Sequence, residues 1–215
     1  EQAGFGFYQT TTRAGSRSSS AEAYLKPIRQ RPNLTVITHA KASRVQFENG
    51  KATGVVYSIK EKGAHEISAR REVILSGGAI NSPQLLMLSG IGPSQHLQAH
   101  GIDVLVDAPG VGGNLQDHLD VCTLQRCTQN VTYDKTNDIA IGLNFYLFKQ
   151  GAGTSNIVEA GGFVRSPLAE DERPDVQFHF VPAQLDDHGR NRLPGFGYTL
   201  HACFLRPKSR GRLSL

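Results

Sequence analysis

Short runs of apolar and β-branched residues, separated by glycine-containing turns, recur along the chain and predict more strands than helices. In the first half these predicted strands lie at residues 34–38, 43–47, 52–59, 66–69 and 72–75. Asn49-Gly50, between two alternating runs, is a strong signal of a hairpin turn. Residues 73–75 are wholly apolar, which predicts that this antiparallel meander ends in a covered sheet.

Four helices interrupt the strand pattern. They are expected at residues 21–28, 84–88, 94–99 and 138–148. Three serines precede the first helix, and Ser82-Pro83 precede the second, where Ser82 fits the N-cap and Pro83 fits the first helical position. Residues 1–20 are polar and rich in Gly, Thr and Ser, which predicts a loop.

The second half of the chain has a different texture, with aromatic and β-branched strands. These are expected at residues 120–125, 157–164, 176–181, 198–205 and 211–215, after a short strand at 104–106. The change places a domain boundary near residue 119, giving domains over 1–118 and 119–215. The predicted fold class is mixed, with α+β and α/β character.

Composition adds limits to this picture. Hydrophobic residues make up 39% of the 215 and charged residues 20%, with a net charge of +4, which is typical of a globular protein. The basic cluster at 206–212 is interpreted as a solvated turn, so no nucleic-acid partner is expected. Cys122, Cys127 and Cys203 form no metal-spaced pair, so no metal site is expected. Their odd number, without a leader segment, favours reduced thiols and a cytoplasmic location.

Ser76-Gly77-Gly78 come directly after the apolar run at 73–75 and before the Ser-Pro helix. Glycines at the end of a strand let a ligand lie against the backbone, and the helix N-terminus offers amides and a positive dipole end. Crevices of this kind bind cofactors in α/β sheets. From spacing alone, a plain strand-to-helix turn is the preferred interpretation, because the chain contains no GxGxxG motif.

Two motifs give a resemblance that covers the whole chain. Gly78–Gly92 looks like the second signature of the glucose-methanol-choline (GMC) oxidoreductases, with Ser-Pro, paired aliphatic residues and Ser-Gly-Ile-Gly. Pro109–His118 is similar to the Gly-Val-Gly-x-Asn-Leu-Gln-Asp-His segment of that family. Glu159–Phe163 and Arg206–Gly211 resemble its choline dehydrogenase branch.

The resemblance implies a fold and a cofactor. Residues 1–118 would be the middle part of an FAD-binding domain of the glutathione-reductase type with a β-meander, and residues 119–215 the first part of an antiparallel-sheet substrate domain. The backbone of Ala42 would meet the adenine of FAD. Ser76, Gly77 and Gly78 would lie near the adenosine, and Asn114 near the flavin side, in a role that stays open.

Glu159 and His179 are the candidates for the substrate cavity. The resemblance places them in the half-domain that forms it, where a carboxylate can pair with a quaternary ammonium beside aromatic rings such as Phe163, Phe178 and Phe180. The alternative, preferred for both, is structural: Glu159 on the polar face of a sheet and His179 as a hydrogen-bonded core histidine.

The implied parent is an FAD-dependent alcohol dehydrogenase that oxidises choline or a similar primary alcohol to the aldehyde by hydride transfer to the flavin. The chain has no initiator Met, no GxGxxG and no match to the catalytic histidine segment of the family, so it is expected to be an internal fragment, inactive alone and without a catalytic residue.

Several expectations about function and partners stay open. The alternatives are a non-catalytic binding or scaffold domain, or a GMC enzyme acting on aliphatic or polymer alcohols. The electron acceptor and a peripheral membrane association of the parent are not decided by the sequence. Exposed strand edges predict that the chain forms oligomers.

Overall fold

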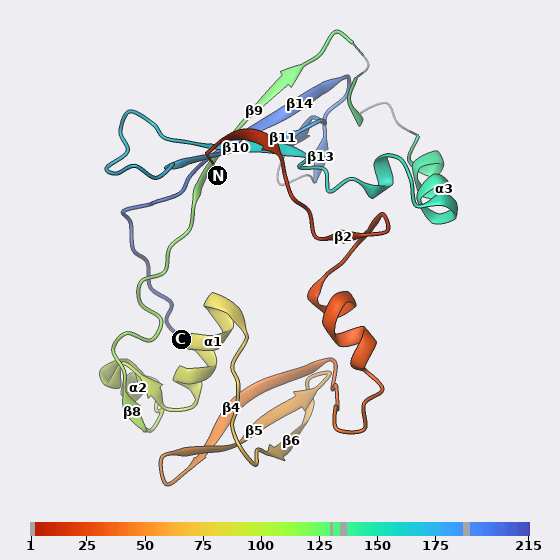
Figure 1. The fold of residues 1–215 in the computed structure, drawn as a ribbon. Helices are drawn as coiled ribbons and strands as arrows, with labels where there is room; N and C mark the ends of the chain where they lie inside the picture. Colours follow the sequence, from red (N-terminus) through yellow and green to blue (C-terminus); the bar gives the residue numbers. More distant parts are fainter. Residues whose placement is uncertain (1–2, 130, 134–136, 187–189) are drawn as a thin grey trace. The chain divides into compact units, whose positions relative to one another are not determined.

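The computed structural model describes residues 3–129, 131–133, 137–186 and 190–215 (Figure 1). It divides into two compact units, one comprising Glu1–Leu34 with His118–Pro207 and the other Thr35–Asp117 with Lys208–Leu215. Both contain antiparallel sheets and helices, which confirms the mixed fold class. That residues 1–118 belong to an FAD-binding domain and 119–215 to a substrate domain stays a prediction.

The predicted meander forms the sheet of the second unit (Figure 1). It consists of β4 (Ala40–Glu48), β5 (Lys51–Ile59) and β6 (Lys62–Ser68). Asn49 and Gly50 have φ values of 50° and 76°, the left-handed pair that a two-residue hairpin turn requires. The local sequence alone therefore determined this turn and the register that it sets.

Helix α1 (Gly78–Leu88) packs beside the meander, and α2 (Ser94–Ala99) follows it in the chain. Between and after these helices, the short strands β7 (Ile91–Gly92) and β8 (Val106–Asp107) pair in parallel. Met87 and Leu97 are fully buried and form the core of the unit together with Val45. The helix predicted at 94–99 is confirmed.

Helix α1 begins several residues earlier than predicted. Gly77, and not Ser82, is its N-cap, and Pro83 lies inside the helix instead of at its first position. Ser82 still serves the N-terminus, because its Oγ accepts a hydrogen bond of 2.9 Å from the amide of Gly77. A serine in the second turn can therefore accept a hydrogen bond from the amide of the N-cap residue, and the spacing in the sequence did not reveal this contact.

Three predicted strands are absent from the described part of the chain. Residues 34–38 and 72–75 have no regular structure, and the side chain of Ile74 is 74% exposed. Within 211–215 only Gly211 forms a bridge, with Leu115. Apolar composition favours an extended backbone, but a strand also needs a neighbour to bond with, and no described strand pairs with the first two segments.

The first unit is built on a five-stranded antiparallel sheet with the order β1-β10-β11-β14-β9 (Figure 1). Its strands are β1 (Gly4–Phe7), β9 (Leu119–Arg126), β10 (Ala160–Val164), β11 (Val176–Val181) and β14 (Gly197–Phe204). The prediction of a loop over residues 1–20 is wrong at β1, which pairs with β10. These two strands lie far apart in the sequence, so no local pattern signals their pairing.

Smaller elements complete the first unit. They are β2 (Thr12–Arg13) paired with β3 (Ser16–Arg17), a π-helical turn (Ala21–Leu25), two 3₁₀ turns (Lys26–Ile28 and Ala152–Thr154), α3 (Asp138–Phe148), and β12 (Leu185–Asp186) paired with β13 (Asn191–Arg192). Helix α3 is confirmed and is capped by Asn137, whose side chain accepts from the amides of Ile139 and Ala140. No helix among the described residues is long and apolar enough to cross a membrane.

Candidate functional site

A cavity of about 610 Å³ in the second unit lies between the meander and α1. Its lining residues are Ala40, Lys41, Ala42 and Val55 from the sheet, 73–77 from the segment before α1, and Asn81, Ser82, Gln84, Leu85 and Leu88 from the helix. Three of the residues predicted to bind the cofactor, Ala42, Ser76 and Gly77, share these walls. The fold thus brings together positions from separate segments of the sequence.

The entry into α1 explains why glycines stand at this wall. A Cβ on Gly77 would lie 3.1 Å from the Cβ of Asn81 and 3.2 Å from the amide nitrogen of Ser82. Gly78 has a φ of 80°, which residues with a side chain rarely adopt. The first amides of a helix have no carbonyl partner within it and carry the positive end of its dipole. This end of α1 borders the cavity.

The lining fits a nucleotide in size and chemistry. Small-molecule pockets commonly measure about 300–1,000 Å³ and combine apolar walls with a few polar groups. Ala42, Val55 and Leu85 offer apolar surface of the kind that a flat adenine ring covers. Lys41 and Asn81 add a cation and an amide, which can bind phosphate or ribose oxygens. Lys41 and Asn81 are site candidates that the sequence analysis did not single out.

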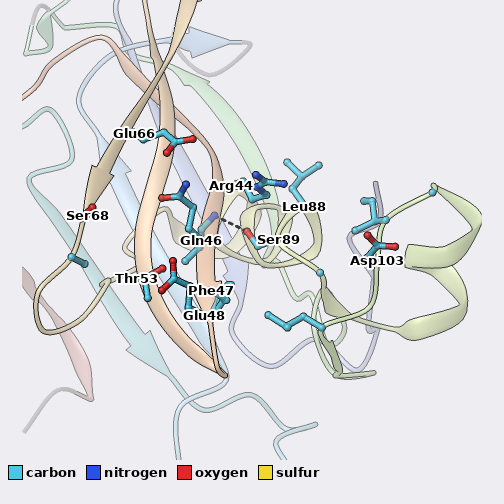
Figure 2. A pocket seen from close by; sticks show the side chains of 16 residues that line it. Arg44, Gln46, Phe47, Glu48, Thr53, Glu66, Ser68, Leu88, Ser89 and Asp103 are labelled. Carbon is cyan, nitrogen blue, oxygen red and sulfur yellow. Dashed lines mark hydrogen bonds between the residues drawn. The ribbon is translucent and has the colours of Figure 1, made fainter.

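A second, larger cavity of about 940 Å³ lies between the meander and the turns that follow α1 and α2 (Figure 2). Charged side chains line it, including Arg44, Glu48, Glu66 and Asp103. Leu88 lines both cavities, so α1 is a wall shared between them. Covering these charged side chains with an adenine ring would remove them from water at a cost in free energy, so this cavity suits bulk water better than adenine.

Ser89 fastens α1 to the meander. Its buried Oγ accepts a hydrogen bond of 2.9 Å from the amide of Val45 and donates one of 2.6 Å to the carbonyl of Leu85, and Figure 2 shows the first of these contacts. The serine of the Ser-Gly-Ile-Gly sequence therefore has a structural role. It holds the helix against β4, and these two elements form the walls of the candidate cofactor cavity.

The other two predicted cofactor residues do not line the cavity. Gly78 is the first residue of α1, next to the lining residue Gly77. Asn114 is exposed, has a φ of 59°, and its carbonyl accepts a hydrogen bond from Gln116. Close packing accounts for a glycine nearby, because a Cβ on Gly112 would lie 2.3 Å from the carbonyl oxygen of Leu213.

Glu159 lies in the first unit and is half-buried among hydroxyl groups. Its Oε1 accepts hydrogen bonds from Tyr133 and, at 2.6 Å, from the Oγ of Ser155. Its backbone carbonyl accepts from the amide of Tyr8 at 2.9 Å. Burial and the hydrogen bond to Glu159 raise the pKa of Tyr133. Tyr133 and Ser155 escaped the sequence analysis because only the folded loops bring them to the carboxylate.

His179 stands on β11 beside two other rings. The ring centroid of Tyr8 is 5.6 Å away and that of His201 is 6.5 Å away, edge-on. Burial and then the charge of His201 lower the pKa of His179, which favours the neutral imidazole at pH 7. Strand alternation places Phe178 and Phe180 on the opposite face of the sheet from His179, so these two rings cannot share its surroundings.

Comparison with known proteins adds independent information. A family model described as GMC oxidoreductase matches residues 1–120. An alcohol dehydrogenase [acceptor] from Pseudomonas putida is 49% identical, with all of this chain aligned to 40% of that protein. The mitochondrial choline dehydrogenase of Mus musculus is 45% identical, with all of this chain aligned to 36% of it. The chain thus spans about two fifths of the length of these relatives.

Solved structures agree with the sequence relatives. A formate oxidase of Aspergillus oryzae, studied for the modification of its FAD, superposes with a TM-score of 0.89 and 26% identity, and the match covers 100% of this chain and 42% of that protein. A pyridoxine 4-oxidase, given as from Mesorbium loti, has a TM-score of 0.78 and 28% identity over 99% of this chain and 38% of its own. The motifs, the family model and the relatives all agree, and the chain belongs to the GMC oxidoreductase family.

Proposed function

We propose that the cavity between β4 and α1 holds the adenosine part of FAD, and that the protein to which this chain contributes oxidises an alcohol to an aldehyde. FAD supplies the acceptor for the hydride that leaves the alcohol carbon. The residues of this chain bind and orient, and none of them is assigned a catalytic role. The presence of Ala42, Ser76 and Gly77 together in the lining of one cavity carries this proposal.

Each group that lines the cavity is assigned a role in binding the cofactor. The backbone at Ala42 and the side chains of Val55 and Leu85 cover the adenine, and the first turn of α1 together with Lys41 attracts the negative charge of the phosphates. Gly78 keeps the backbone close to the ligand. Asn114, outside this cavity, is proposed to act on the flavin side of the cofactor.

A binding experiment on the 215-residue chain tests the proposal. FAD fluorescence is titrated with the chain, and ADP is added as a competitor that carries only the adenosine end. Ala42→Leu adds a larger side chain to the cavity wall, and an overpacking cost of about 1–3 kcal/mol predicts affinity about 5- to 150-fold weaker. Ala99→Leu, on the exposed end of α2, is the matched control and should bind like the wild type.

Two results would refute the assignment. One is equal affinity of wild type and Ala42→Leu for FAD, with both variants folded by circular dichroism. The other is FAD binding that excess ADP does not displace, because the cavity would then not hold the adenosine.

For the substrate we propose choline or a similar primary alcohol, with Glu159 and His179 as residues of its binding site and the carboxylate of Glu159 facing the quaternary ammonium. The two hydroxyl donors support this, because they hold the carboxylate in a fixed orientation. Glu159→Gln should weaken choline binding at least tenfold, measured by calorimetry, whereas His179→Gln should have a smaller effect. Equal choline affinity of the Glu159→Gln variant and the wild type would contradict this role.

An aliphatic primary alcohol is the second candidate. The relative with 49% identity, which is named an alcohol dehydrogenase rather than a choline dehydrogenase, favours it. The absence of Trp from the sequence also removes the best cation–π residue for a quaternary ammonium. If wild type and Glu159→Gln bound 1-octanol with equal affinity and neither bound choline, the result would support this candidate over the first.

Association between chains is a further proposal. Within the part of the chain that the structure describes, no strand pairs with the outer side of β1 or β9, and exposed apolar residues such as Phe5, Phe7 and Val121 lie on these strands. Light scattering that shows a monodisperse monomer would contradict it. A cytoplasmic location and a peripheral membrane association of the parent stay predictions, and the sequence predicts no particular electron acceptor.

A further inference from the structure

One face of the five-stranded sheet collects side chains that bind metals. In the register of β9 and β14, Cys122 stands opposite His201 and Asp120 opposite Cys203. Residues directly opposite in an antiparallel pair project from the same face, and so do residues two apart along one strand. A thiol, an imidazole and a carboxylate therefore meet at one point, although the two strands lie far apart in the sequence.

The distances show that the groups are already in contact. The Oδ2 of Asp120 lies 2.7 Å from the Nδ1 of His201, and the Sγ of Cys122 lies 3.0 Å from the same nitrogen. Asp120, Cys122 and His201 each offer one ligand atom, and these three atoms all lie within 4.8 Å of one another. The Sγ of Cys203 is 3.2 Å from the other carboxylate oxygen of Asp120.

We propose that Asp120, Cys122 and His201 form a binding site for a thiophilic divalent cation of the zinc class. Zinc accepts sulfur, imidazole nitrogen and carboxylate oxygen in a single tetrahedral shell. Calcium and magnesium prefer shells of oxygen alone, which this set does not provide. Three protein ligands leave a fourth position for water.

The ligand atoms of this site lie closer together than they would around a bound ion. Bonds of about 2.0–2.3 Å to a tetrahedral zinc place ligand atoms roughly 3.3–3.8 Å apart. The two contacts to His201 are shorter than this, so the ligands must separate by about 1 Å or less when an ion enters. Side-chain rotation provides such a movement, and two paired strands hold the backbone in register. The thiol proton leaves to solvent as the ion binds.

The surroundings of the site favour entry of an ion. Cys122 and Asp120 are exposed, so an ion reaches them from solvent without rearrangement of the sheet. The ring of His179 lies edge-on to His201, which restricts how that imidazole can turn. The site lies wholly in the first unit, and the proposed adenosine cavity lies wholly in the second. The metal proposal and the FAD proposal can therefore fail separately.

Cobalt(II) provides a direct test, because it replaces zinc and is coloured. The reduced 215-residue chain is titrated with Co²⁺ and followed by the thiolate-to-cobalt charge-transfer band in the near ultraviolet, and Zn²⁺ is then added to displace it. One equivalent should saturate the band. Cys122→Ser should abolish it, whereas Cys127→Ser, which removes a cysteine just beyond the end of β9, should leave it unchanged.

A second variant keeps the test informative if Cys122→Ser does not fold. Asp120→Asn preserves shape and removes a charged ligand, so the band should remain while the Co²⁺ affinity falls at least tenfold, since even an outer-shell partner of a metal site contributes about 10- to 100-fold. Circular dichroism checks the fold of each variant. No saturable band in wild type, a band that survives Cys122→Ser, or unchanged affinity in Asp120→Asn would overturn the proposal.

Discussion

We predict that the hydrogen bond from the amide of Val45 to Ser89 holds the two walls of the candidate cofactor cavity, β4 and α1, against each other. The contact joins the end of α1 to the middle of β4, two elements that are distant in the sequence. Both residues are buried, with Ser89 8% exposed and Val45 4%. Replacing Ser89 with Ala removes the acceptor and leaves the buried amide of Val45 without its protein partner.

The magnitude follows from that burial. A buried donor left without a partner costs about 1–3 kcal/mol, whereas an exposed donor regains a water and costs little. The carbonyl of Leu85 also loses the hydroxyl that donated to it at 2.6 Å. We therefore expect the local opening of β4 to become about 5- to 150-fold more frequent in Ser89→Ala.

Hydrogen–deuterium exchange with mass spectrometry measures this opening in peptides that cover residues 40–48. Ser43→Ala is the matched control, because Ser43 lies on the same strand and donates at 3.2 Å to the carbonyl of Val56, but on an exposed surface. Exchange in Ser43→Ala should resemble that of the wild type. If Ser89→Ala left the exchange of β4 unchanged, or if both variants accelerated it equally, burial would not be the source of the effect.

Three further predictions concern packing and charge. Met87→Ala should lower the free energy of unfolding, measured with urea, by about 2–5 kcal/mol, because that side chain is fully buried. A loss under about 1 kcal/mol would contradict this, because it would mean that the surrounding residues close the cavity that the substitution leaves. Gly54→Ala should cost about 1–3 kcal/mol in the same assay, because its Cβ would lie 2.6 Å from the carbonyl oxygen of Ile67, and a neutral result would contradict the close approach of β5 and β6 at this position. His179 has a folded-state pKa lowered by burial and by the charge of His201, so the unfolded chain binds the proton more readily and stability should decline as pH falls below about 6.5. Urea unfolding from about pH 5 to about pH 7.5 should show a shallower decline in His179→Gln, and equal slopes would speak against this shift.

Local patterns predicted the elements whose signals lie within a few residues. The hairpin at Asn49-Gly50 needs only two residues that tolerate a positive φ, and α3 needs only an apolar stretch behind a capping Asn137. The family motif at Gly78–Gly92 was equally visible, because a specific run of residue types is a property of the sequence alone. Residues 72–75 show the limit of such reasoning, since their apolar run indicates an extended backbone but does not provide the neighbour that would make it a strand.

The sequence by itself therefore determined the family, the hairpin of the meander, the helices α2 and α3, and the position of the glycine turn before α1. The tertiary structure decided what came together: Ala42 with Ser76 across a cavity, Tyr133 with Glu159, and Cys122 with His201 on paired strands. The cysteines showed no metal spacing because spacing along a chain describes ligands in one loop or helix. Strands from distant parts of the sequence bring ligands together through hydrogen-bond register, and that register is fixed only when the sheet forms.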